Sequence, residues 1–122
     1  MRRTASQMSV EELIGRFIEI GIAQDQALLE DRISKFNRLY DEKTVILAAL
    51  KALPGDQRRL LVSLLEHPNM QVRLNAANAT LATAPGPARR ALEAIAASRH
   101  FPQAGDAGMT LGSLDDGTYK PT

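Results

Sequence analysis

The chain of 122 residues contains no cysteine and no tryptophan, and only 4% of its residues are aromatic. Without cysteine it has no disulfide framework, no thiolate metal site and no thiol nucleophile. Its two histidines, His67 and His100, lie far apart in the sequence and form no local chelating pair. No apolar run approaches the roughly 20 residues that span a bilayer, and no apolar segment follows Arg2 and Arg3 as in a signal peptide. We therefore expect a cytoplasmic protein without metal, cofactor or membrane partner.

Alanine and leucine dominate the apolar residues, whereas valine is scarce. Alanine and leucine lose little side-chain entropy in a helix, while β-branched and aromatic residues favour strands. No stretch alternates apolar and polar residues between hairpin turns. The composition therefore predicts an all-α fold, and the length predicts one domain.

Residues 1–8 show no periodicity and are expected to form a loose arm. Ser9 followed by Glu12 predicts a capping box, which begins a helix from Val10 to about Ala23. A second apolar stripe predicts one long helix over 25–53, with two helices joined near Asp41 as the alternative. The members of this stripe are Leu29, Ile33, Phe36, Tyr40, Leu47 and Leu50. Residues 10–53 would thus form a long helical pair.

Pro54 and Gly55 are a strong stop signal after this pair. Three shorter helices are predicted beyond it: Gln57–Glu66 after Asp56, Met70 to about Thr83 after Asn69, and Pro87–Ser98. Four of the eight glycines lie in the remaining segment, 99–122. This segment is predicted either as a flexible tail or as a short helix over 107–115, with Asp106 as its cap and Gly117 at its end.

The segment from His67 to Leu81 combines a Pro-Asn turn, Val72-Arg73, a pair of alanines and a final leucine. This pattern resembles the second helix of a HEAT-like repeat. The resemblance implies a right-handed α–α superhelix of about five helices, HEAT-like over 57–98, in which Arg73 ties a turn. Because only about two repeats fit, the first helices would cap one end of the stack. The tail or a second copy of the chain, as a homodimer, would cover the other end.

A longer pattern runs from Asn37-Arg38-Leu39-Tyr40-Asp41 through Pro-Gly, a leucine-rich helix, Val-Arg and Ala-Ala. It resembles a bacterial family of small helical proteins with no assigned function, over residues 10–97. Helical proteins of this general kind are sometimes encoded beside secreted toxins and act as immunity proteins. That likeness suggests a class of function by analogy only.

Basic residues concentrate in the middle of the chain, where 32–99 hold 11 basic and 5 acidic residues. Arg32, Lys35 and Arg38 recur every three residues and form one helical stripe. The wider basic set is Arg32, Lys35, Arg38, Arg58, Arg59, Arg89 and Arg90. Such a face fits a phosphate backbone or an acidic protein, and solvated side chains paired with acidic neighbours are the simpler interpretation. Aromatic side chains are not interleaved, which counts against single-stranded nucleic acid.

A second candidate site comprises Gln71, Asn75 and Asn78 on the polar side of the helix from Met70. In HEAT-like folds the second helices line the concave face where partners bind, although ordinary solvated side chains explain these residues too. No motif predicts catalysis, since adjacent carboxylates on a helix point about 100° apart. We therefore expect a non-enzymatic protein that sequesters a partner protein on a polar, arginine-rich concave surface. Nucleic-acid binding through a basic face of 32–99 is the alternative.

Overall fold

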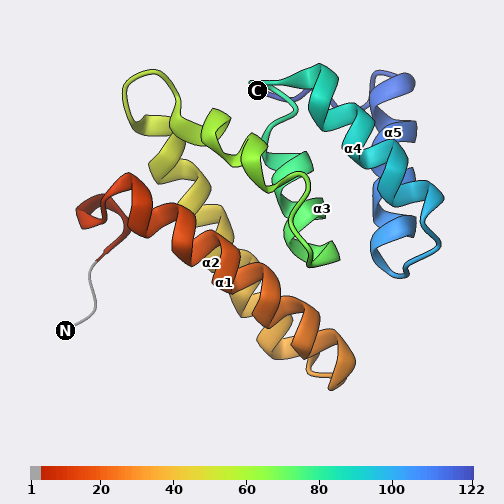
Figure 1. The fold of residues 1–122 in the computed structure, drawn as a ribbon, viewed down its shortest axis with the longest axis horizontal. Helices are drawn as coiled ribbons and strands as arrows, with labels where there is room; N and C mark the ends of the chain where they lie inside the picture. Colours follow the sequence, from red (N-terminus) through yellow and green to blue (C-terminus); the bar gives the residue numbers. More distant parts are fainter. Residues whose placement is uncertain (1–3) are drawn as a thin grey trace. The chain divides into compact units, whose positions relative to one another are not determined.

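The computed structural model describes residues 4–122, and every regular element within them is helical (Figure 1). The elements are the 3-10 helices η1 (Ala5–Gln7) and η2 (Gln57–Leu64) and the α-helices α1 (Val10–Leu29), α2 (Ile33–Ala52), α3 (Met70–Ala79), α4 (Pro85–Ala97) and α5 (Gln103–Asp115). The predicted all-α fold is confirmed. The prediction of one domain stays a prediction. Residue contacts group the chain into two compact units, divided between Leu60 and Leu61. Each unit is described on its own.

In the first unit, α1 and α2 lie side by side as an antiparallel hairpin (Figure 1). The predicted capping box begins α1. The amide of Glu12 donates to Ser9 Oγ at 3.1 Å, and the amide of Ser9 donates to Glu12 Oε1 at 3.2 Å. The buried apolar side chains of the hairpin come from both helices: Leu13, Phe17, Ile20 and Ala27 from α1, and Leu39, Ile46 and Leu50 from α2.

The turn between the two helices lies later than the sequence predicted. α1 continues through the buried Gly21 to Leu29, and the chain turns at Asp31, whose φ is 56°. The predicted helix end near Ala23 is therefore wrong, and so is a single helix over 25–53. The alternative join near Asp41 is also wrong, because α2 is continuous there. The apolar stripe was misleading because it runs on through the turn, where Leu29 and Ile33 are 76% and 57% exposed.

The segment before α1 contains a short ordered element in place of the expected loose arm. Ala5–Gln7 form η1, and the amide of Thr4 donates to Gln7 Oε1 at 3.1 Å. η1 contacts α2, which brings the chain before Ser9 onto the hairpin. The part of the predicted arm at residues 1–3 lies outside the described residues.

The segment after Pro54 and Gly55 is helical, but it is the 3-10 helix η2 and not the predicted α-helix over 57–66. Asp56 adopts a φ of 48°, and its carboxylate accepts bonds from the Arg58 guanidinium at 2.9 and 2.7 Å. Asp56 also accepts a weaker bond from the Arg58 amide at 3.3 Å. Its carboxylate thus mainly holds the Arg58 side chain. The prediction that Asp56 caps an α-helix is wrong.

In the second unit, Asn69 caps α3 as predicted. Its Oδ1 accepts from the amides of Gln71 at 2.9 Å and Val72 at 3.1 Å. α3 then ends at Ala79, earlier than the predicted Thr83. Arg73 Nε donates to the carbonyl oxygen of His67 at 2.6 Å, so Arg73 does tie a turn. A HEAT-like repeat and its handedness stay predictions.

The last two helices complete the second unit. α4 begins at Pro85, two residues before the predicted start, and packs against both α3 and α5 (Figure 1). The tail is a helix, α5, which begins four residues before the predicted position, so Asp106 lies in its first turn and does not cap it. Gly117, with a φ of 78°, follows its end as predicted. The buried core of the unit is Leu74, Ala77, Leu81, Ala88, Leu92, Ile95 and Ala107.

Candidate functional site

Three adjoining hollows lie along the α1–α2 hairpin. The first, which we call the apolar hollow, has a volume of about 450 Å³ and is lined by Ala5, Met8, Arg16, Glu19, Glu42, Val45 and Ile46. The second, the basic hollow, has about 430 Å³ and is lined by Arg16, Lys35, Arg38, Leu39 and Glu42. The third, the tip hollow, has about 420 Å³ and is lined by 31–35 and Arg38. Each hollow shares two side chains with the next, and we call the three adjoining hollows together the groove.

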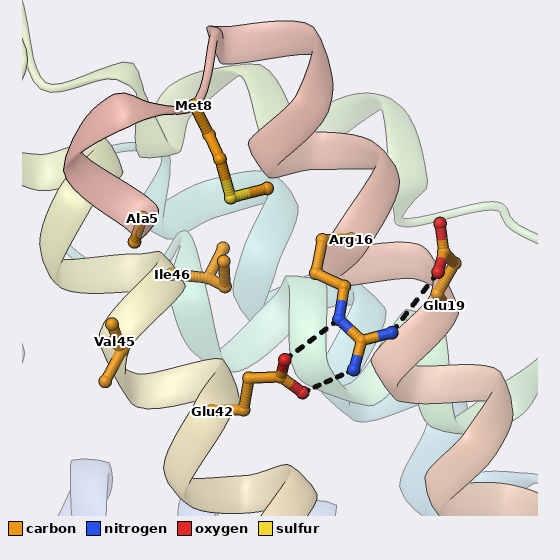
Figure 2. A pocket seen from close by; sticks show the side chains of 7 residues that line it. All are labelled: Ala5, Met8, Arg16, Glu19, Glu42, Val45 and Ile46. Atoms are coloured by element: carbon orange, nitrogen blue, oxygen red, sulfur yellow. Dashed lines mark hydrogen bonds and ion pairs between the residues drawn. The ribbon is translucent and has the colours of Figure 1, made fainter. Parts of the chain in front are cut away.

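Arg16 of α1 and Glu42 of α2 form the boundary between the apolar and basic hollows (Figure 2). Arg16 Nε donates to Glu42 Oε1 at 3.0 Å, and Arg16 Nη2 donates to the other carboxylate oxygen at 2.5 Å. Arg16 Nη1 also donates to Glu19 at 3.2 Å. These contacts raise the pKa of Arg16, chiefly through its hydrogen bond to Glu42. A bidentate bridge between the helices holds both side chains in place.

The far end of the apolar hollow is made of aliphatic side chains. Met8, from the segment before α1, points into the hollow from one side, and Val45 and Ile46 of α2 form the other side (Figure 2). Val45 is 56% exposed, so this hollow leaves apolar surface open to solvent. Its polar edge is the Arg16–Glu42 bridge together with Glu19. The hollow is therefore amphipathic, with its charged groups confined to one side.

The structure brings the predicted stripe of Arg32, Lys35 and Arg38 together on the wall of the tip hollow. Arg32 faces Glu30 at 4.0 Å. Within residues 4–122, Lys35 and Arg38 form no ion pair with any acidic side chain. These two cations extend into the basic hollow, where Arg16 and Glu42 already neutralise each other. The basic hollow consequently carries surplus positive charge at Lys35 and Arg38, whereas the tip hollow also contains the carboxylate of Asp31.

Other basic residues of 32–99 do not add to the basic hollow, because some are paired with acidic side chains and some lie in the second unit. Arg58 is paired with Asp56 at 2.7 Å, and Arg89 is paired with Asp115 at 2.8 Å and Glu93 at 3.7 Å. The set is also divided between the two compact units. Arg73 and Arg90 line a separate hollow of about 690 Å³ in the second unit, whereas Arg32, Lys35 and Arg38 share the tip hollow.

The predicted polar site on α3 is largely internal. Gln71 and Asn75 are only 5% and 2% exposed. Gln71 Nε2 donates to Asn75 Oδ1 at 3.0 Å, and Gln103 Nε2 of α5 donates to Gln71 Oε1 at 2.9 Å. The interpretation of a solvated polar face is therefore wrong for Gln71 and Asn75, whose amides join α3 to α5. Asn78 is partly exposed, with its Oδ1 buried.

No group of three or more histidine, aspartate or glutamate side chains is placed to hold a metal ion in the part of the chain that the structure describes. His67 has a local role, because its Nδ1 accepts from the amide of Asn69 at 3.0 Å in the turn before α3. Among the described helices, none is both long and apolar enough to cross a membrane.

Sequence reasoning found three residues of the groove and missed the rest. Arg32, Lys35 and Arg38 were predictable because they follow one another on a single helix. Arg16 and Met8 were not, because their positions depend on how α1 and the segment before it pack against α2. The only sequence signal for Glu42 was its place beside Asp41, and the pair has no common role in the structure.

These features define a small protein whose regular elements, within residues 4–122, are all helical. The chain belongs to the family described as "Domain of unknown function (DUF2019)", which matches residues 11–115. A similar chain is known from the crystal structure of the protein RPA1889 from Rhodopseudomonas palustris CGA009. It is 54% identical, and the match covers 99% of this chain and 100% of that chain with a TM-score of 0.95. No curated protein matches this chain. The prediction of a small helical family without assigned function is thus confirmed.

Proposed function

We propose that this chain is a non-enzymatic binding module that holds an acidic segment of a partner protein in the basic hollow. The observation that carries the proposal is the position of Lys35 and Arg38. Both line one hollow of about 430 Å³, and neither has an acidic partner within residues 4–122. Carboxylates of a partner would supply the charge-assisted hydrogen bonds that these two side chains lack.

The surroundings of the two cations favour a fixed recognition surface. Lys35 and Arg38 lie on α2, and the bridge between Arg16 and Glu42 joins α2 to α1 beside them. A partner would therefore meet side chains on a rigid helical element. Charge complementarity of this kind mainly sets the orientation and the rate of association. The module would act by occupying the partner's acidic surface, as an immunity protein does, and not by chemistry.

The proposal is tested with a fluorescein-labelled peptide rich in aspartate and glutamate, measured by fluorescence anisotropy. The variant is the double substitution Lys35→Gln and Arg38→Gln. Its matched control is Lys51→Gln with Arg59→Gln, which removes the same two residue types from exposed positions outside the three hollows. We expect at least about a tenfold loss of peptide affinity in the first variant, on the order of two lost charged contacts, and little change in the control. Far-ultraviolet circular dichroism checks that both variants fold.

Two results would overturn this proposal. Equal weakening in both variants would mean that the peptide responds only to net charge. Tighter binding of a labelled DNA duplex, falling steeply with salt, would assign the groove to nucleic acid, because counterion release scales with the number of phosphate contacts.

A further inference from the structure

We infer that the segment bound by the groove carries an apolar side chain beside its acidic residues, and that this side chain enters the apolar hollow. The inference rests on the proposed function and specifies the partner sequence. Its starting point is that the apolar and basic hollows share Arg16 and Glu42, so one continuous ligand would contact both.

The apolar hollow has both the chemistry and the room for a large aliphatic or aromatic side chain. Met8, Val45 and Ile46 line it, and Val45 is 56% exposed. Its volume of about 450 Å³ lies within the roughly 300–1,000 Å³ of typical ligand pockets. Methionine adapts its shape readily to what packs against it. A side chain entering here would cover apolar surface that solvent now contacts.

The charges fix which part of the ligand lies where. Arg16 is already bonded to Glu42 and Glu19, so it offers little to an incoming carboxylate. Glu19 and Glu42 also line the apolar hollow and would repel an acidic side chain from it. Lys35 and Arg38 line only the other hollows. The acidic residue therefore belongs at Lys35 and Arg38, and the apolar residue belongs beyond the bridge.

The helix geometry sets the spacing between the two. Arg38 and Val45 are seven residues apart on α2, which corresponds to about 10 Å along the axis at roughly 1.5 Å per residue. An extended chain rises roughly 3.3 Å per residue. An extended ligand therefore needs an apolar residue about three positions from the acidic one. A helical ligand would need about seven positions to cover the same distance.

The test uses fluorescein-labelled peptides that have the same composition and each contain one acidic pair and one leucine. The leucine lies three positions from the pair in one set and seven positions in the other, and each spacing is made on both sides of the pair. A third peptide has alanine in place of leucine. We expect the three-position peptide to bind about tenfold more tightly than the alanine peptide, on the order expected for partial burial of a leucine side chain. The Val45→Ser variant should lose most of that advantage. The control Leu29→Ser changes an exposed leucine of the same hairpin outside the hollows and should keep it.

The outcomes separate this inference from the proposed function. If the leucine and alanine peptides bind equally, and Lys35→Gln with Arg38→Gln still abolishes binding, the inference is refuted and the basic hollow stands. If the seven-position peptide binds best, the extended spacing is refuted. If no peptide binds, the proposed function and the inference both fail.

Discussion

Replacing Gln71 by leucine is expected to destabilise the protein more than replacing Gln71 and Gln103 together. Gln71 lies between two other amides, donating to Asn75 at 3.0 Å and accepting from Gln103 at 2.9 Å. Gln103 is only 1% exposed, and its Oε1 has no hydrogen-bond partner within the described residues. The substitution Gln71→Leu therefore leaves the Gln103 amide buried without a partner.

The magnitude follows from these contacts. Two hydrogen bonds are lost, each with a net contribution of about 1 kcal/mol, and a buried amide without partners costs about 1–3 kcal/mol more. We expect Gln71→Leu to lower the free energy of unfolding by about 3–5 kcal/mol. Adding Gln103→Leu removes the unpaired amide, so the double variant should recover about 2 kcal/mol of that loss.

Urea unfolding followed by far-ultraviolet circular dichroism measures both variants, since the chain has no tryptophan to report by fluorescence. Met109→Ala serves as the control, because Met109 is an exposed residue of α5 and should change the stability by no more than about 0.5 kcal/mol. A double variant less stable than Gln71→Leu alone would refute the reasoning, because the two losses would then add as they do for independent sites.

Two further predictions concern the first unit. Ser9→Ala should lower the free energy of unfolding by about 1 kcal/mol because α1 loses its cap, whereas Ser9→Asp should keep most of it; an equal loss in both would contradict a capping role. Burial lowers the pKa of Lys43 to about 8, below its ordinary value of 10.5. Between these values the unfolded chain binds more protons than the folded one, so wild-type stability should rise with pH from 8 to 10.5. Lys43→Met should be the more stable protein below pH 8, and its advantage in urea unfolding should shrink across that interval; an advantage that does not change with pH would count against the lowered pKa.

Two helix caps were predicted correctly from the sequence because their partners lie within a few residues, whereas the caps predicted at Asp56 and Asp106 were wrong. Ser9 and Glu12 form the capping box that begins α1, and Asn69 caps α3 through the amides two and three positions later. The turn at Asp31 gave no such signal. A left-handed φ usually points to glycine, and here an aspartate adopts it. Gly21, which weakened the predicted helix, lies inside α1.

The candidate sites show the same difference between residues that are close in the sequence and residues that only packing brings together. Arg32, Lys35 and Arg38 were expected to form one stripe, because three-residue spacing on a helix keeps side chains on a slowly turning face. Their meeting with Arg16 required the register of α1 on α2, which no short pattern encodes. To predict that Gln71 is buried, one would have to know its contact with Gln103, which lies 32 residues later. Gln103 belongs to the segment for which a flexible tail was one of the two predictions. Polarity alone therefore placed Gln71 on the wrong side of its helix.

The glycines of α5 make the stability of this helix depend on its neighbour. Gly105, Gly108 and Gly112 lie within this helix, and each disfavours helix formation by about 1 kcal/mol relative to alanine. Ala104 and Ala107 are buried, and α5 packs against α4. Its order must come from that packing, because the segment has little helical tendency of its own. The backbone amides of α5 should therefore open to solvent whenever α4 does, so that the two helices behave as one cooperative unit.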